Sequence, residues 1–244
     1  MNQKLKKGIL QEKNCFITGA TGGIGKEIAR ELASAKCNLF LTARDNAALK
    51  KLALSLEKEY KIKVGFFAGD LHKDSDIKKI IQSARKTFDI IDILINSAGI
   101  FDIKPLKEST LEDFEKSFST NIRAPFIFSK AFSDDMVFQK WGRIVNIGSS
   151  SSYSGFSNTS IYCSSKHAIL GLSRAINAEL KKHNVRAFCI SPGSTNTKMG
   201  RKSVDQDYKT FINPIELAET VAFLISFDKE MVIDEIRLNR MIIQ

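Results

Sequence analysis

The stretch TGATGGIG, residues 18–25, begins where the apolar run CFIT (15–18) ends and leads into a segment with helical spacing of apolar residues. Its glycines follow the pattern Gly19-x-x-x-Gly23-x-Gly25. Glycines at a strand-to-helix turn let the backbone bend tightly and approach a pyrophosphate, whose charge lies against the helix N-terminus. Glycines can also do no more than shape a turn, but the strand–turn–helix context favours a dinucleotide site.

Short apolar runs alternate with longer segments of helical period along the rest of the chain. Continuous apolar runs are typical of strands buried on both faces. Strand–helix alternation predicts right-handed crossovers, and hence an α/β fold of the Rossmann type, with a doubly wound parallel sheet and helices on both faces. We expect a single domain over residues 1–244. The predicted strands are 15–18, 38–42, 63–68, 91–96, 143–148, 186–191 and a last one within 234–241. The predicted helices cover about 47–60, 75–88 and 111–138; one more begins near 26, and another includes Tyr162.

Composition and charge exclude several classes of protein. The 244 residues carry a formal net charge of +10, but the basic residues are scattered over the polar faces of predicted helices, so we expect no nucleic-acid partner. No apolar run approaches the roughly 20 residues that span a bilayer, and no secretory signal is evident, so no membrane association is expected. Four cysteines without paired spacing indicate reduced thiols of a cytoplasmic protein. The three histidines have no second ligand at suitable spacing, so no metal site is expected.

A tyrosine and a lysine lie four residues apart in IYCSSKHAIL, residues 161–170. Positions i and i+4 share a helix face, so Tyr162 and Lys166 can point into one cleft. An ammonium about 5 Å from a phenol, at an effective dielectric near 20, favours the phenolate by about 3 kcal/mol, or roughly two pKa units. The spacing therefore suits an acid/base that works near neutral pH.

Five motifs in order give the chain a resemblance to the short-chain dehydrogenase/reductase family: TGATGGIG (18–25), NSAG (96–99), Ser149, the YCSSK pair (162–166) and SPG (191–193). The chain is most similar in character to 3-oxoacyl-[acyl carrier protein] reductases and small carbonyl reductases. Two features depart from them. The final residues lack the Thr-Gly and Gly-Gly signature of many fatty-acid reductases, and the substrate-loop region, about 194–213, is short.

The resemblance implies roles for four catalytic residues. Tyr162 is the acid/base, Lys166 tunes it, Ser149 orients the carbonyl, and Asn121 holds a water that completes a proton relay. Ser150, Ser151 and Ser152 directly follow Ser149, so a register shift by one would assign the orienting role to a neighbour.

The resemblance also implies a set of cofactor contacts. Asp70 fits equally well as a cap of the following helix. In the family, Asn96 stabilises the sheet and Ser97 replaces a second asparagine, a mild departure. The full set is Gly19, Thr21, Gly22, Gly23, Ile24, Gly25, Arg44, Asp70, Leu71, Asn96, Ala98, Gly99, Tyr162, Lys166, Pro192, Gly193, Thr195 and Thr197.

The end of the second predicted strand indicates which dinucleotide is used. Ala43 leaves room at the ribose, and the Arg44 guanidinium can bind a 2′-phosphate, so we expect NADP, with NAD as the alternative. Asp45 is expected to point away as a helix cap. Many NADP-dependent relatives carry a second basic residue at the position of Gly22. Because glycine has no charge, the expected preference for NADP over NAD is weaker.

Together these features predict an oxidoreductase that transfers hydride between NADP(H) and a small carbonyl or secondary alcohol, such as a 3-oxoacyl thioester or ketone. A non-catalytic dinucleotide sensor on the same fold is the alternative. By resemblance, the helices at 111–138 and after Tyr162 would join copies into a homodimer or homotetramer. Substrate specificity is expected to come from the segments after Gly99, around 150–158 and around 199–208.

Overall fold

The runs on either side of the glycine turn form neighbouring strands in a computed structural model that describes residues 8–203 and 206–241. The described strands make one sheet in the order β3-β2-β1-β4-β5-β6-β7, and each neighbouring pair is parallel. The predicted doubly wound parallel sheet is therefore confirmed. The strands are β1 (Asn14–Thr18), β2 (Asn38–Ala43), β3 (Val64–Ala68), β4 (Ile93–Asn96), β5 (Gly142–Ile147), β6 (Val185–Pro192) and β7 (Glu235–Leu238).

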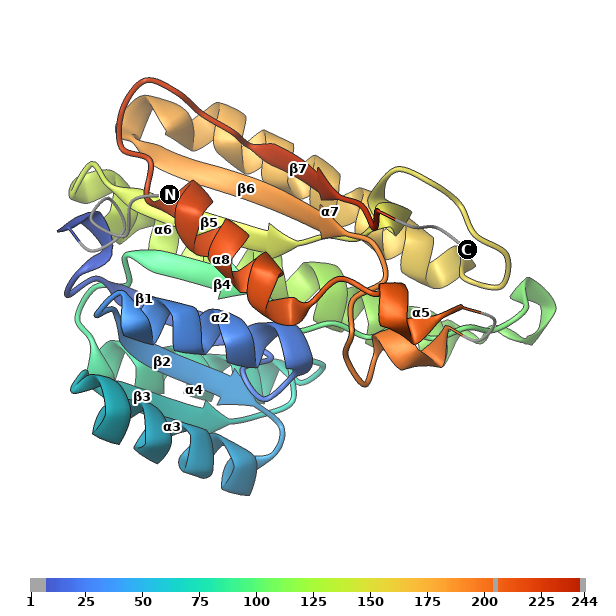
Figure 1. The fold of residues 1–244 in the computed structure, drawn as a ribbon, viewed down its shortest axis with the longest axis horizontal. Helices are drawn as coiled ribbons and strands as arrows, with labels where there is room; N and C mark the ends of the chain where they lie inside the picture. The colour runs from blue at the N-terminus through green and yellow to red at the C-terminus, as the bar shows by residue number, and fades with distance from the viewer. Residues whose placement is uncertain (1–7, 204–205, 242–244) are drawn as a thin grey trace.

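Helices cover both faces of this sheet (Figure 1). Burying apolar side chains of helices against both faces explains why the central strands lack polar alternation. The helices are α2 (Gly23–Ser34), α3 (Asn46–Tyr60), α4 (Asp74–Thr87), α5 (Leu111–Phe118), α6 (Ala124–Phe138), α7 (Ser160–Leu180) and α8 (Pro214–Ile225). Short turns of 3₁₀-helix are η1 (Leu106–Glu108), η3 (Ser150–Ser152), η4 (Lys181–His183), η5 (Gly200–Lys202) and η6 (Tyr208–Thr210).

Two apolar cores result, one on each face. On the first, α2, α3 and α8 bury residues such as Ile28 and Leu49 against the sheet. On the second, α4 and α6 enclose a group of aromatic rings, with Phe16 stacked on Phe40 at a centroid distance of 5.5 Å and tilted against Phe128 at 4.9 Å. Each buried ring removes a large apolar area from water, which is the main stabilising term of the fold.

The helical stretch predicted around 111–138 is confirmed, but it is not α-helical throughout. A π-helical turn, η2 (Ser119–Arg123), separates α5 from α6. A π-bulge inserts one residue into the helical repeat and is common at functional sites. The inserted turn contains Asn121, so this irregularity places the predicted relay residue.

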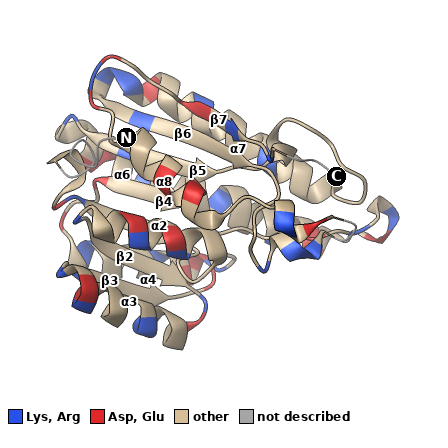
Figure 2. Cartoon of the chain, viewed as in Figure 1, with Lys and Arg blue, Asp and Glu red and all other residues tan. Residues whose placement is uncertain are grey.

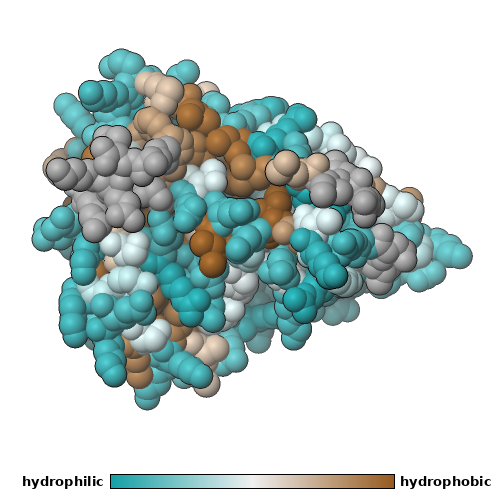
Figure 3. Space-filling view, in the orientation of Figure 1, coloured by the Kyte–Doolittle hydropathy of each residue, from teal (hydrophilic) through white to brown (hydrophobic). Residues whose placement is uncertain are grey.

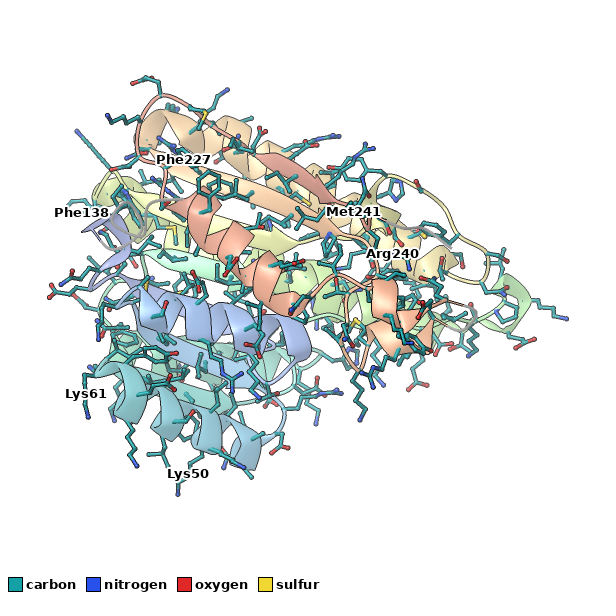
Figure 4. The ribbon with its side chains drawn as sticks, in the orientation of Figure 1. Lys50, Lys61, Phe138, Phe227, Arg240 and Met241 are labelled. Carbon is teal, nitrogen blue, oxygen red and sulfur yellow. The ribbon has the colours of Figure 1, made fainter. Side chains whose placement is uncertain are left out.

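Charges on the surface are mixed. Figure 2 shows Lys and Arg interspersed with Asp and Glu over the helices seen from this side. In Figure 4, Lys50 and Lys61 extend outward from the α3 region, as expected for solvated positions. The absence of a nucleic-acid partner remains a prediction. Within the described ranges, no helix has the length and apolar character that crossing a membrane requires.

Candidate active site

The glycine turn folds as the spacing predicts. Gly19 has φ +65°, in the left-handed region, and a Cβ there would lie 2.8 Å from the Ala98 backbone. Glycine is therefore needed at this position both for its conformation and for the close approach. Helix α2 begins at Gly23, and its N-cap, Gly22, provides no side-chain cap. The first-turn amides are thus left to donate hydrogen bonds to an anionic group.

Three predicted cofactor segments meet at the carboxyl ends of the strands. A Cβ on Gly23 would lie 2.5 Å from the Thr197 methyl group, which places the loop after β6 against the glycine turn. The Thr18 hydroxyl accepts hydrogen bonds of 3.1 Å from the amides of Ser97 and Ala98. Thr18 was missed as a site residue in the sequence, although it is the first letter of the glycine motif.

The loop after β6 is fixed by its own backbone and by the end of β7. The Gly193 amide donates to the Leu238 carbonyl at 2.8 Å, and the Thr195 hydroxyl donates to the Gly193 carbonyl at 3.1 Å. Pro192 is buried at the strand end. Asn96 is also buried, and its side-chain amide donates to Asn146 Oδ1 of β5 at 2.8 Å. In this structure Asn96 therefore links β4 to β5.

Asp45 takes the orientation that the sequence predicts. The Asp45 carboxylate accepts from the Ala48 amide at 3.0 Å, so it caps α3. This confirms the predicted cap. Arg44 is exposed, and in the described ranges no hydrogen bond or ion pair joins its guanidinium to another residue. It is therefore free to bind a phosphate beside the ribose site.

Asp70 does not cap the next helix, so that alternative is wrong. The N-cap of α4 is Lys73, while the Asp70 carboxylate accepts from the His72 amide at 3.1 Å in a local turn. The side chain of Leu71 is buried in the second apolar core. Only the backbone of Leu71 is therefore available to an adenine ring.

Ser149 acts on the Tyr162 phenol and opposes the rise of its pKa, which fits the register expected from the resemblance. Ser149 also caps η3: its oxygen accepts from the Ser151 amide at 3.1 Å, and its own amide donates to Ser152 Oγ at 3.1 Å. Ser151 and Ser152 are buried in this turn. Of the four consecutive serines, Ser149 is thus the one that acts on the pKa of the tyrosine.

The expected lowering of the tyrosine pKa is not observed. Burial raises the pKa of Tyr162 to about 12, and Ser149 opposes this only in part. Lys166 is 6% exposed, and burial lowers the pKa of its ammonium to about 8. Its Nζ donates to the Ile147 carbonyl at 2.7 Å and lies 5.7 Å from the Tyr162 ring centroid. Desolvation of the phenol therefore decides the direction of the shift, and Lys166 is not among the groups that cause it.

Asn121 forms a clamp beside the lysine. Its Oδ1 accepts from the Ile100 amide at 2.8 Å, and its Nδ2 donates to the Ile100 carbonyl at 3.1 Å and to Ser165 Oγ at 2.9 Å. A Cβ on Gly99 would lie 3.5 Å from Asn121 Oδ1 and 3.9 Å from Lys166 Nζ. Asn121, Gly99 and Lys166 therefore lie together, as predicted.

The segment after Gly99 lies against the described part of the substrate-loop region, 194–213, of which 204–205 lie outside the described residues. Phe101 packs on Tyr162 with ring centroids 4.6 Å apart. From the substrate loop, Lys202 donates to the Phe101 carbonyl at 2.8 Å and pairs with Asp102 at 3.2 Å. Beside it, the Arg240 guanidinium lies 5.3 Å from the Phe211 ring and donates to Thr210 at 3.1 Å; Figure 4 labels Arg240 near the end of the chain. No spacing in the sequence indicated these contacts.

Within the described ranges, no group of three side chains gathers that could hold a metal ion. The four cysteines are buried and free.

Comparison with known proteins agrees with this geometry. Residues 13–208 match the family model described as short chain dehydrogenase. The chain is 31% identical to the 3-oxoacyl-[acyl-carrier-protein] reductase FabG of Aquifex aeolicus, over 89% of this chain and 91% of that protein. It is also 31% identical to the 2,3-dihydro-2,3-dihydroxybenzoate dehydrogenase of Bacillus subtilis, over 90% and 91%.

Solved structures give the same assignment. An alcohol dehydrogenase from Thermococcus sibiricus, complexed with 5-hydroxy-NADP, superposes with a TM-score of 0.86 at 28% identity, covering 94% of this chain and 97% of that one. A short-chain dehydrogenase from Sphingobium yanoikuyae in complex with NADPH gives 0.81 at 29%, covering 93% and 87%. The family match, the shared fold and the Ser149–Tyr162–Lys166 arrangement lead to one conclusion: the chain belongs to the short-chain dehydrogenase/reductase family of oxidoreductases.

Proposed function

We propose that the protein is an NADPH-dependent reductase of small carbonyl compounds, which also runs in the alcohol-oxidising direction. The observation that carries the proposal is the placement of the Tyr162 ring 5.7 Å from the buried Lys166 ammonium, with Ser149 acting on the phenol. A phenol that stays protonated and faces a second hydroxyl is suited to hold a carbonyl oxygen and to protonate it.

Each side chain then has a defined task in the reduction. The chemistry that NADPH would supply when bound at this site is a hydride for the carbonyl carbon. Ser149 donates a hydrogen bond to the carbonyl oxygen, where negative charge develops. Tyr162 transfers its phenolic proton to that oxygen, giving the alcohol and a phenolate. The Lys166 ammonium favours the phenolate that remains, and Asn121, bonded to Ile100 and Ser165, holds the backbone beside the lysine.

The residues present fit a dinucleotide. The uncapped N-terminus of α2 offers backbone amides to the pyrophosphate, and Thr197 closes the other side of the glycine turn. Arg44 would bind the 2′-phosphate, since Asp45 is turned away as a helix cap. The two solved structures compared above were determined with 5-hydroxy-NADP and with NADPH, which supports the same cofactor here.

The reductase proposal is tested with NADPH deuterated at the transferable position of nicotinamide C4. Turnover with a panel of ketones, hydroxyketones and 3-oxoacyl thioesters should place deuterium on the new carbinol carbon, detected by mass spectrometry. The named relatives act on chemically different substrates, so the panel covers both acyl and ring ketones. Tight NADPH binding without deuterium transfer to any panel member would favour the dinucleotide sensor instead.

We also propose self-association through α5 and the following segments. Leu111 is 84% exposed, and the rings of Phe114 and Phe126 are also exposed. Figure 3 shows further apolar side chains at the surface near α8. Exposed apolar groups of this size are typical of subunit contacts. Light scattering after size exclusion should give a dimer or tetramer; a monomer at micromolar concentration would contradict this proposal.

A further inference from the structure

The last strand carries two charged residues that reach the turn of the orienting serine. Glu235 and Arg237 are two positions apart on β7, so their side chains lie on the same face of the sheet. The Tyr153 hydroxyl donates to Glu235 Oε2 at 3.0 Å, and the Arg237 guanidinium lies 3.5 Å from the Tyr153 ring centroid. These residues belong to the chain end that departs from the fatty-acid reductase pattern.

Tyr153 belongs to the same turn as Ser149. It is the C-cap of η3, and its amide donates to the Ser150 carbonyl at 3.1 Å. At the other end of η3, the Ser149 carbonyl accepts from the Ser152 amide at 2.8 Å. Together with the cap that Ser149 forms with Ser151 and Ser152, these bonds join the two ends of the turn. Ser149 and Tyr153 are therefore linked through the hydrogen bonds of one short turn.

The same carboxylate holds the helix of the catalytic pair. Arg174 of α7 donates to Glu235 through both Nε, at 2.5 Å, and NH2, at 3.0 Å. The Arg174 side chain is 58% exposed, so solvent weakens its ion pair with Glu235. The hydrogen bond from Tyr153 therefore holds Glu235 more firmly than the ion pair does. Glu235 thus joins the serine turn, the Tyr162 helix and the edge strand.

We infer that Glu235 and Tyr153 are positioning residues for Ser149 in the reduction proposed above, on which this inference rests. Glu235 fixes the Tyr153 hydroxyl, Tyr153 fixes η3, and η3 fixes the hydroxyl that orients the carbonyl. Arg174 and Arg237 keep the pKa of Glu235 below its usual range, so the carboxylate stays charged at neutral pH. No group of this cluster touches the reacting atoms directly.

The kinetic test is a double-mutant cycle between Tyr153→Phe and Ser149→Ala. The Phe ring retains the Arg237 contact and loses only the hydroxyl. We expect kcat to fall about three- to tenfold in the wild-type background, less than the hundredfold or more lost with a direct oxyanion donor, and NADPH affinity to stay unchanged. In the Ser149→Ala background the same change should have no further effect. Equal losses in both backgrounds would overturn the inference.

A second measurement does not depend on turnover. Hydrogen exchange of the amides at 150–153 should speed up about tenfold or more in Tyr153→Phe and in Glu235→Ala. Glu235→Gln retains a neutral acceptor and should restore much of the protection. Tyr60→Phe, at the end of α3, is the matched control and should change neither readout. Unchanged exchange in Tyr153→Phe would refute the anchoring role, whereas faster exchange in a chain without reductase activity would refute the proposed function alone.

Discussion

Replacing Arg44 with alanine is expected to remove most of the preference for NADPH while leaving NADH use nearly unchanged. The guanidinium is exposed at the end of β2, and Asp45 is bound to the Ala48 amide of α3. A 2′-phosphate at this position would therefore meet one positive charge and no opposing carboxylate. NADH lacks this phosphate and gains little from the arginine.

The magnitude follows from the exposure of the site. A charge-assisted hydrogen-bonded pair contributes about 1.5–3 kcal/mol, and solvent screening favours the lower half of this range. With Gly22 in place of a second basic residue, only Arg44 contributes in this part of the turn. We therefore expect kcat/KM with NADPH to fall about ten- to thirtyfold in Arg44→Ala.

The assay is the initial rate with each dinucleotide, for the wild type, Arg44→Ala and Asp45→Asn. Asparagine also caps helices well, so Asp45→Asn removes the charge and keeps α3 intact. This variant should retain the wild-type ratio of NADPH to NADH within about threefold. Equal kcat/KM with both dinucleotides in the wild type, or an improved use of NADPH only in Asp45→Asn, would refute the reasoning and identify Asp45 as the ribose ligand.

Two further predictions concern stability. Gly19→Ala should lower the free energy of unfolding, measured in urea, by more than about 1–2 kcal/mol, because alanine is strained at φ +65° and its Cβ would lie 2.8 Å from Ala98. The control is Gly171→Ala, at an open helical position, which should leave the free energy of unfolding unchanged or raise it. Equal effects of the two substitutions would contradict this account. Lys166→Met should raise the melting temperature at pH 7 while abolishing turnover, because burial lowers the lysine pKa to about 8. Lys166 binds its proton more tightly in the unfolded chain, so the stability of the wild type rises with pH between about 8 and 10.5. The difference in stability between the wild type and Lys166→Met should therefore narrow over this range. A difference in stability that does not depend on pH would contradict this prediction.

Local signals in the sequence were sufficient for the fold. Strand–helix alternation and the glycine turn each depend on residues close together in the chain, so the parallel sheet and the role of Gly19 were predictable. The cap at Asp45 was predictable for the same reason, since it binds an amide three residues away. Asp70 shows the limit of such reasoning, because its carboxylate closes a local turn and the helix starts later, after Lys73.

Features that depend on distant residues were not predictable. The sign of the pKa change at Tyr162 is decided by burial, which the i, i+4 spacing to Lys166 does not reveal. The contact of Phe101 with Tyr162 and the bond of Tyr153 to Glu235 join segments far apart in the chain. The π-helical turn η2 between α5 and α6 was also not predicted, because the apolar pattern continues across it.

The most direct test of the central claim is the turnover of Tyr162→Phe together with its affinity for NADPH. Phenylalanine keeps the ring beside Phe101 and removes only the hydroxyl. If Tyr162 is the proton donor, kcat should fall by more than about a hundredfold while the Kd for NADPH changes by less than about threefold. A variant that keeps more than about a tenth of the wild-type kcat would lose less than about 1.4 kcal/mol of transition-state stabilisation, and would contradict this assignment.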